Sequence, residues 1–302
     1  METPEPEPRN RPFRRLAPTL RTAVAIFLSL LCTVLDRARA LAEEAKPARV
    51  VSINMCTDEL LLRLADRDRI ASVTWLSRDG RNANMAEVAA TIPANHGLAE
   101  EVVSYHPDLV LAGVYTTRTT VQLLKGIGLK VVEFGVPKTL DGVRQQIRDV
   151  AAAVGESARG EAVVAEMDAR LDRLAPHAHN PPLNAIVLRP NGFSVGKGSL
   201  VNELLERAGL VNLATRLGID NYLQIPLETV ALQQAGILIL NGASAGAPSL
   251  ATETLHHPIV AKLGERLKVI SMRLWTCAGP SVVDAVELLI ERTNPSAVGP
   301  TQ

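Results

Sequence analysis

Aromatic side chains are the residues of this sequence best suited to holding a bulky ligand. Six of the nine aromatics stand at or after the end of a predicted strand or in a loop: Trp75, Tyr115, Phe134, Phe193, Tyr222 and Trp275. Core-filling aromatics would fall within strands and helices, so this placement indicates another role. Tryptophan and tyrosine offer flat apolar faces with a polar edge. We expect Trp75, Tyr115, Phe193, Tyr222 and Trp275 to wall a ligand cleft, the alternative being hydrophobic packing under loops.

Several basic residues share these loops, namely Arg78, Arg118 and Arg189, with Lys197 nearby. Arginine binds carboxylate, phosphate or an anionic metal chelate through paired donors. A solvated loop charge is the alternative for any one of them. Arg78 is kept as a candidate ligand contact because it follows Trp75 closely. We expect Arg78 and Arg118 to bind anionic groups of a ligand. His96 is also expected at the cleft, since its loop adjoins it.

The sequence gives no support for catalysis. It offers no serine elbow, no paired Cys and His with an orienting group, and no paired carboxylates on one element. The six histidines supply no converging set of three or four metal ligands. The segment Gly196-Lys197-Gly198-Ser199 partly matches the phosphate-loop motif. That motif fails, because Asn191 stands where the first glycine is required and Gly198 stands where a serine or threonine is required. We therefore expect no enzyme, no cofactor and no metal site.

Composition narrows the class of protein further. The chain has 302 residues, 47% hydrophobic and 21% charged, with 32 basic and 32 acidic side chains. These values are typical of a globular protein and exclude a disordered or fibrous one. A nucleic-acid binder would carry a basic excess on one face, so nucleic acid is not an expected partner.

Residues 1–42 have the order of a cleavable secretory signal. Arginines crowd the start, an apolar run covers Ala23 to Leu35, and small residues follow around Ala38 to Ala42. The run is shorter than the ~20 residues that span a bilayer, although a permanent anchor is the alternative. A lipid-anchor site needs a small residue directly before its cysteine, but Leu31 precedes Cys32. We expect an exported, periplasmic protein without a lipid anchor.

Short β-branched runs alternate with helical patterns through the rest of the chain. Strands are predicted at Val50–Ile53, Ala71–Thr74, Asp108–Ala112, Lys130–Phe134, Ala185–Leu188, Gly236–Leu240 and Lys268–Ser271. Helices are predicted between them, such as Asp58–Ala65, Val121–Lys125 and Leu200–Ala208. This alternation indicates an α/β fold with parallel sheets covered on both faces, in two Rossmann-like lobes.

The segment from Leu140 to Leu174 has no strand pattern and two helical stretches, one ending near Gly155 and one starting at Ala158. We interpret the second as the helix that joins two lobes, although one more packing helix of a single domain fits the same periodicity. The predicted divisions are a signal peptide at 1–42, an N-terminal α/β lobe at 43–155, a linker helix at 156–176 and a C-terminal α/β lobe at 177–302.

A weak internal repeat favours two lobes. Residues 98–111 are matched by residues 226–239, each a short acidic helix that leads into a buried strand. Chance patterning of an α/β chain can also produce such a repeat.

Three segments carry a resemblance to a known family. Arg49–Leu60, Arg69–Thr74 and Pro107–Ala112 resemble the periplasmic substrate-binding proteins of ABC importers for iron complexes and cobalamin, and the similarity runs from about Ala48 to Arg292. The resemblance implies a class III periplasmic binding protein: two α/β lobes joined by one long helix, with the ligand between them and little hinge motion. It also implies an inner-membrane permease as partner, docking through Glu100 and Glu228, and a monomer.

The cysteines depart from the better-known members of that family. Cys56, next to Met55, falls in the first cleft loop and Cys277 falls in the last, where the family contacts its ligand. A disulfide and a thiolate that ligates the metal of the cargo both remain open. The disulfide is favoured because free thiols oxidise outside the cytoplasm.

The resulting hypothesis is a non-enzymatic periplasmic receptor for a bulky metal chelate. Cobalamin and a ferric siderophore are the leading ligands, and the aromatic count favours cobalamin. Haem is third, with His96 or Tyr115 as an axial ligand. A receptor for bare metal ions and a two-lobed chelatase-like enzyme are the rival classes.

Overall fold

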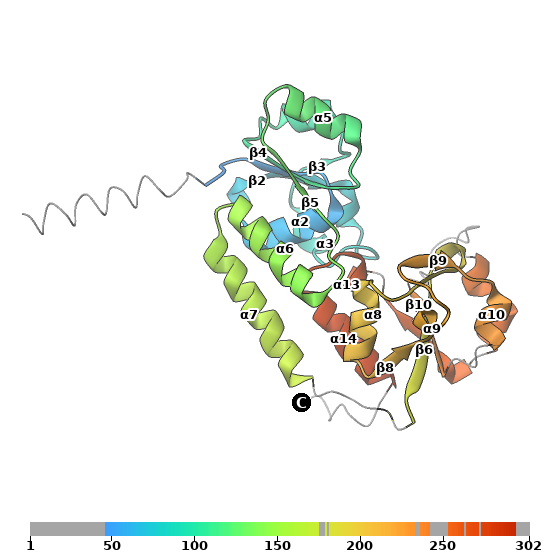
Figure 1. Cartoon of the computed structure of the whole chain (residues 1–302). Coiled ribbons are helices and arrows are strands. Elements are labelled where there is room, and N and C mark those ends of the chain that lie inside the picture. The colour runs from blue at the N-terminus through green and yellow to red at the C-terminus, as the bar shows by residue number, and fades with distance from the viewer. Residues whose placement is uncertain are drawn as a thin grey trace, which may run out of the picture. The chain divides into compact units, whose positions relative to one another are not determined.

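Two parallel β-sheets organise the chain in the computed structural model (Figure 1). The structure describes residues 46–174, 179, 181–232, 236–241, 253–262, 264–271 and 273–293. The predicted signal peptide, residues 1–42, lies outside the described residues. Pro47–Gln302 forms one compact unit by itself. Among the described residues, no helix has both the length and the apolar character needed to cross a membrane.

The first sheet has the strand order β3-β2-β1-β4-β5, and all its pairs are parallel. Its strands are β1 (Val50–Ser52), β2 (Ile70–Thr74), β3 (Ala94–Asn95), β4 (Leu109–Gly113) and β5 (Val131–Phe134). The order places β1 in the middle, with β2 and β3 on one side and β4 and β5 on the other.

The second sheet has the order β11-β10-β6-β8 and is also parallel. Its strands are β6 (Leu183–Leu188), β8 (Leu210–Asn212), β10 (Ile237–Asn241) and β11 (Leu267–Ile270). A small antiparallel pair, β7 (Phe193–Val195) and β9 (Tyr222–Gln224), lies beside it. Phe193 and Tyr222 therefore lie in strands, which corrects their prediction as loop residues.

The α-helices of the described residues lie between and beside the two sheets. Those of the first sheet are α2 (Met55–Leu64), α3 (Ala86–Ala90), α4 (Ala99–Ser104), α5 (Arg118–Gly126) and α6 (Leu140–Ala153). They are followed by α7 (Ser157–Arg173), α8 (Leu200–Arg207), α9 (Leu213–Arg216), α10 (Leu227–Leu232), α12 (Pro258–Ala261), α13 (Arg273–Thr276) and α14 (Val282–Thr293). Along the chain, helix α7 comes after the last strand of the first sheet and before the first strand of the second, and it lies alongside α6 (Figure 1).

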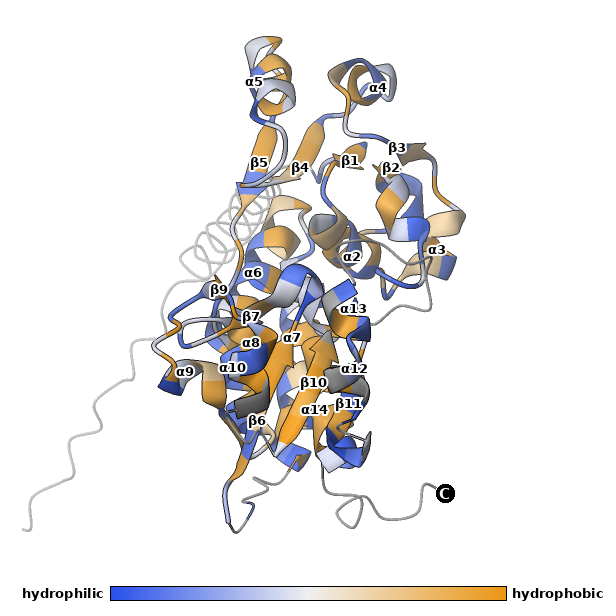
Figure 2. Ribbon diagram, turned by 90° about the vertical axis from the view of Figure 1, so that its right-hand side faces the viewer, coloured by the Kyte–Doolittle hydropathy of each residue, from blue (hydrophilic) through white to orange (hydrophobic). Residues whose placement is uncertain are grey.

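Alternate side chains of each strand enter different cores, as the two-residue period of a strand requires. In β6, Ala185 and Val187 face one core while Ile186 and Leu188 face another. The strands are accordingly apolar on both faces, as Figure 2 shows for β6 and β10. This is the pattern expected of parallel strands covered by helices on both sides.

The largest core is shared by the two sheets. Buried side chains of β1, α2, α6 and α7 form a single cluster with those of β6, α8 and α14. Two smaller clusters cover the outer faces, one on each sheet. The fold is therefore the predicted one, two parallel α/β lobes with one long helix between them. The predicted lobe boundaries, at 155 and 176, stay predictions.

Candidate functional site

The loops that follow the strands of the first sheet lie along one edge of that sheet, because all strands of a parallel sheet end at the same edge. Asn54 to Cys56 follow β1, Trp75 follows β2, His96 follows β3, Tyr115 comes just after β4, and Val136 to Lys138 come just after β5. Since β4 and β5 are neighbours, Tyr115 and the 136–138 segment share one end of this edge. Trp75 and His96 share the other end.

A cavity of about 300 Å³ lies against the β4 and β5 end of this edge. The first lobe contributes four of its lining residues and the second lobe contributes the rest: Tyr115, Val136, Pro137, Lys138, Arg189, Gly198, Ser199, Leu200, Val201, Asn221, Tyr222, Trp275, Thr276 and Ala278. The cavity is therefore formed between the lobes. We call it the cleft cavity.

Three aromatic residues are among those that line it. Tyr115 is 85% exposed and Tyr222 is 56% exposed, so both rings stand at the mouth. Trp275, in α13, is only 3% exposed and lines the inside. Trp75 is half-exposed and does not line the cavity. Of the two tryptophans, only Trp275 therefore belongs to this cavity.

Two basic side chains line the cleft cavity, and none of its described lining residues is acidic. Arg189 follows β6, and its guanidinium carbon lies 5.3 Å from the centre of the Tyr222 ring, a cation–π distance. The Nε atom of Arg189 is buried and has no hydrogen-bond partner among the described residues. Lys138 approaches from the other lobe and is exposed.

The start of α8 borders the same cavity. Ser199 caps the helix by accepting a hydrogen bond from the N–H of Asn202 at 3.2 Å. The preceding loop packs tightly, because a Cβ on Gly196 would lie 1.7 Å from the carbonyl oxygen of Ile219. Residues 196–199 thus form the entry to helix α8.

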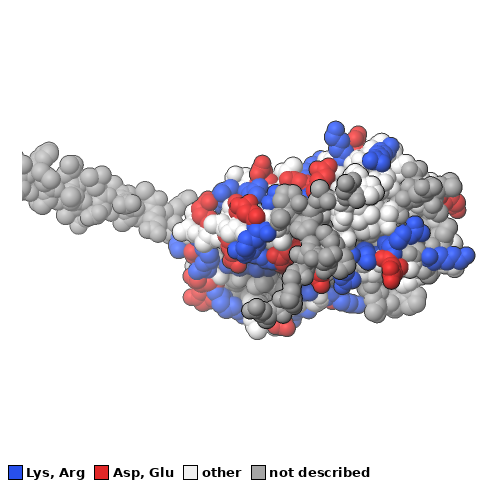
Figure 3. All heavy atoms as spheres, turned by 90° about the horizontal axis from the view of Figure 1, so that it is seen from below, with Lys and Arg blue, Asp and Glu red and all other residues white. Residues whose placement is uncertain are grey.

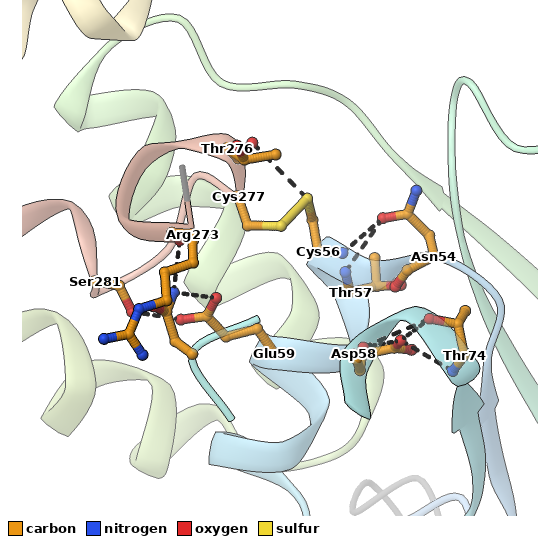
Figure 4. The surroundings of a disulfide bond; sticks show 12 residues. Asn54, Cys56, Thr57, Asp58, Glu59, Thr74, Arg273, Thr276, Cys277 and Ser281 are labelled. Atoms are coloured by element: carbon orange, nitrogen blue, oxygen red, sulfur yellow. Dashed lines mark hydrogen bonds between the residues drawn. A yellow bond between two sulfur atoms is a disulfide. The ribbon is translucent and has the colours of Figure 1, made fainter. Parts of the chain in front are cut away.

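A disulfide bond joins Cys56 and Cys277, whose Cα atoms are 4.9 Å apart (Figure 4). Cys56 is the second residue of α2 in the first lobe, and Cys277 directly follows α13 in the second. Because β1 is the middle strand of its sheet, the bond crosses between the lobes near the centre of the edge. Neither sulfur is a free thiolate in this structure.

A polar network lies beside the disulfide (Figure 4). The buried carboxylate of Glu59 accepts hydrogen bonds from Ser281 Oγ at 2.6 Å and Asn84 Nδ2 at 3.0 Å. Arg63 donates to both Glu59 and Ser281 at 3.1 Å, and Asn84 also donates to the carbonyl of Arg273 at 2.8 Å. These bonds tie the first lobe to the second on one side of the disulfide.

Asp58 is the most perturbed carboxyl group at this edge. Its Oδ2 accepts hydrogen bonds from the N–H of Thr74 at 3.0 Å and from the hydroxyls of Thr74 and Ser77. Its Oδ1 has no partner among the described residues. Complete burial raises the pKa of Asp58 to about 6, although these hydrogen bonds lower it. Asp58 thereby fixes α2 to the end of β2, just before Trp75.

Several predicted ligand contacts lie outside the cleft cavity. Arg78 donates to the backbone carbonyl of Ile92, and Arg118 is the exposed first residue of α5. The ring of His96 lies 2.9 Å from Glu101 through Nδ1 and 6.2 Å from the centre of the Trp75 ring. Phe193 and Met55 do not line the cleft cavity either, although both are partly exposed.

Three of the predicted ligand residues line the cleft cavity: Tyr115, Tyr222 and Trp275. Sequence reasoning missed Lys138 and set Arg189 aside in favour of Arg78. Both missed residues directly follow or closely follow predicted strands, which is the signal that could have identified them. Among the described residues, no group of three or more His, Cys, Asp or Glu side chains is placed to hold a metal ion.

Glu100 and Glu228 occupy equivalent positions on two short helices. Each is the second residue of its helix, α4 and α10 respectively, and each is exposed. The neighbouring Glu101 is engaged by His96, whose N–H donates to it at 2.6 Å. The hydrogen bonds from His96 lower the pKa of Glu101.

Comparison with known proteins gives consistent matches. Residues 50–264 match the family described as periplasmic binding protein. A cobalamin-binding protein of Halobacterium salinarum is 26% identical over 210 residues, which is 68% of this chain and 57% of that protein. The chain therefore spans little more than half the length of this curated relative.

Solved structures share the fold at low sequence identity. A periplasmic heme binding protein from Pseudomonas aeruginosa has a TM-score of 0.68 and 20% identity, over 85% of this chain and 95% of that one. The periplasmic vitamin B12 binding protein BtuF of Vibrio cholerae has a TM-score of 0.62 and 17% identity, over 84% and 99%. At these identities the structures establish the shared fold, and all these relatives are binding proteins rather than enzymes.

Proposed function

The chain belongs to the periplasmic binding protein family, and from that premise we propose that it is the receptor of an ABC importer for a bulky metal chelate, cobalamin first among them. The family comprises the solute-binding components of such importers, which implies an extracytoplasmic location, a small-molecule ligand and a permease partner. Export through a signal peptide at 1–42 and action as a monomer are parts of the same proposal.

The aromatic wall of the cleft cavity carries the choice of a bulky chelate. Tyr115 and Tyr222 stand at its mouth with most of their ring surface in water, and Trp275 lines its interior. Exposed rings around a cavity lose water on binding a flat apolar ligand, which is the main source of affinity for such ligands. We propose that this cavity of about 300 Å³ takes one part of the chelate and that the exposed rings contact more of it outside.

The curated relative named a cobalamin-binding protein supports cobalamin over the other chelates. A ferric siderophore is the second candidate, because Arg189 and Lys138 offer two positive charges to an anionic chelate. Haem is the third. Trp75 and His96 lie at the other end of the first sheet's edge, and we propose them, with Met55, Arg78, Arg118 and Phe193, as contacts for the parts of the ligand outside the cavity.

Equilibrium dialysis of residues 43–302 against cyanocobalamin, haem and ferrichrome tests this function. We expect one-to-one binding of cyanocobalamin that weakens about tenfold in Tyr115→Ala, because a ring contact contributes about 1 kcal/mol or more. Tyr105→Phe is the matched control, since the hydroxyl of Tyr105 donates to the carbonyl of Ala94 outside the cleft cavity. Binding of haem or ferrichrome alone would replace cobalamin, and binding of none of the three would contradict a chelate receptor.

We also propose that Glu100 and Glu228 dock to positive residues of the permease. Both are exposed on the first turns of short helices, and neither has a partner among the described residues. In proteoliposomes that carry the cognate importer, the variant E100A/E228A should bind ligand normally and lose stimulation of ATP hydrolysis. Glu87→Ala, at an exposed acid of α3, should keep it. Full stimulation by the double variant would exclude this docking mode.

A further inference from the structure

The cleft cavity combines an apolar wall with an uncompensated positive charge. Arg189 enters from the second lobe and Lys138 from the first, and no acidic residue is among the described lining residues. No acidic side chain among the described residues forms an ion pair with either group. A receptor for a neutral, purely apolar ligand would not need two unpaired cations in its cavity.

Arg189 is held in place before any ligand arrives. The carbon atom of its guanidinium group lies over the Tyr222 ring, 5.3 Å from the ring centre, and its Nε is buried with no hydrogen-bond partner in the described part of the chain. Burying a charged donor without an acceptor costs free energy unless a partner arrives. The contact with the Tyr222 ring restricts the side chain of Arg189, and a guanidinium offers paired donors that suit a planar oxyanion.

The surroundings of Lys138 and Arg189 favour the same kind of ligand group. Glu203 of α8 does not line the cavity, and its carboxylate accepts a hydrogen bond from the N–H of Leu140 at 2.8 Å. The first turn of α8 lines the cavity, and its N–H groups have no acceptor within the helix. These N–H groups add positive potential at the wall of the cavity.

We propose that Arg189 and Lys138 form an anion subsite in the cleft cavity, which selects chelates that carry a phosphodiester or carboxylate group. The proposal rests on the proposed function, since it concerns the ligand of the same cavity. It assigns specificity to residues of both lobes, so that the anionic group of the ligand contacts the two lobes at once.

Paired probes that differ in the anionic group test the subsite. Cyanocobalamin carries a phosphodiester and dicyanocobinamide lacks it; haem carries two carboxylates and its dimethyl ester lacks them. We expect isothermal titration of residues 43–302 to give at least about tenfold tighter binding of the anionic member of one pair. The pair that shows this preference identifies the source of the anion.

Substitutions separate the anion from other differences between the probes. Arg189→Gln and Lys138→Gln should weaken the anionic probe about tenfold or more and leave its neutral partner within about twofold. Lys138 is exposed, so K138Q retains the fold even if R189Q does not. Arg266→Gln and Lys130→Gln are the matched controls, because both are exposed residues that precede strands, at the opposite sheet edges.

The two proposals fail in different ways. If a chelate binds but its anionic and neutral forms bind equally, or if R189Q and K138Q lower both affinities alike, the subsite is wrong and the receptor function stands. If no chelate binds, the receptor function is wrong, and inorganic pyrophosphate then probes the subsite directly. Pyrophosphate binding that R189Q and K138Q abolish would retain the subsite, and absence of such binding would overturn it.

Discussion

The carboxyl group of Asp58 lies out of contact with water, between the first turn of α2 and the end of β2. Its pKa of about 6 stands above the ordinary value of 3.8 because burial disfavours the charged form. Between about pH 4 and pH 6, the folded chain therefore keeps a proton on this group that the unfolded chain has lost. Ionising Asp58 in the folded chain therefore lowers the free energy of unfolding.

Asp58→Asn should consequently change how stability depends on pH. In the native protein the contribution of Asp58 is fully present below pH 3.8 and is lost as pH rises to about 6, by up to about 3 kcal/mol. The asparagine stays neutral and keeps an acceptor for Thr74 and Ser77. Urea unfolding at pH 4, 5, 6 and 7 should show the native protein losing stability relative to the variant. A difference that stays constant across this range would contradict the raised pKa.

Single residues of the site were predicted where chain position alone decides their place. Tyr115 follows a buried strand, and every strand of a parallel sheet ends at the same edge, so its position at the cleft follows from the sequence. The direction of a long side chain does not follow in this way. Arg78 and Arg189 both follow strands, yet Arg78 turns to the carbonyl of Ile92 while Arg189 lies over Tyr222. That choice depends on tertiary neighbours which a sequence pattern does not specify.

At the scale of elements, the close contact of α6 and α7 depends on a glycine. A Cβ on Gly160 of α7 would lie 2.4 Å from the Cβ of Ala151 in α6, too close for two carbon atoms. Neither atom belongs to a flexible side chain, so the helices themselves would have to separate. The contact between these helices is part of the core that both lobes share.

Gly160→Ala should lower the free energy of unfolding by about 1–3 kcal/mol, since overpacking outweighs the better helix propensity of alanine. Adding Ala151→Gly should restore much of this loss by returning the missing space. Gly126→Ala in α5 is the control, because no heavy atom lies within 4 Å of its new Cβ, and it should be neutral or stabilising by up to about 1 kcal/mol. Equal effects of the 126 and 160 substitutions in urea unfolding would contradict the tight contact.

The elements that the sequence predicts are those with a strong periodic signal. All seven predicted strands are confirmed, because each is a run rich in β-branched or aliphatic residues. Most of them are buried on both faces, whereas β5 and β11 are partly exposed. Strands β3, β7, β8 and β9 were missed, and each has only two or three residues. Every side chain of β9 is exposed, so it shows no alternation that could mark it as a strand. Pairing with β7 fixes it instead.

At the scale of the whole molecule, two features oppose relative motion of the lobes. The largest hydrophobic cluster includes side chains of both sheets, and the disulfide crosses between the lobes beside the Glu59 and Ser281 hydrogen bond. Domain motion is the default only where the shared interface is small and polar. We therefore expect ligand binding with little hinge closure, as the family resemblance implies.

Figure 3 shows charges of both signs interspersed on the face it displays.

Removing the disulfide should weaken the whole fold rather than one lobe. The bond joins residues 221 positions apart, and closing so long a loop restricts the unfolded chain strongly. Cys56→Ser with Cys277→Ser should lower the free energy of unfolding by about 2–5 kcal/mol. Reductant should have the same effect on the native protein and none on the variant. Identical urea midpoints for the native protein, with and without reductant, would contradict a stabilising bond.

The same bond makes most of the described chain a covalent ring, from Cys56 to Cys277. A protease that cuts any one peptide bond within this ring leaves both pieces attached through sulfur. Such a nicked chain stays covalently joined, and we expect it to separate into fragments only after reduction. A single cleavage of a loop between the two cysteines therefore does not release either lobe.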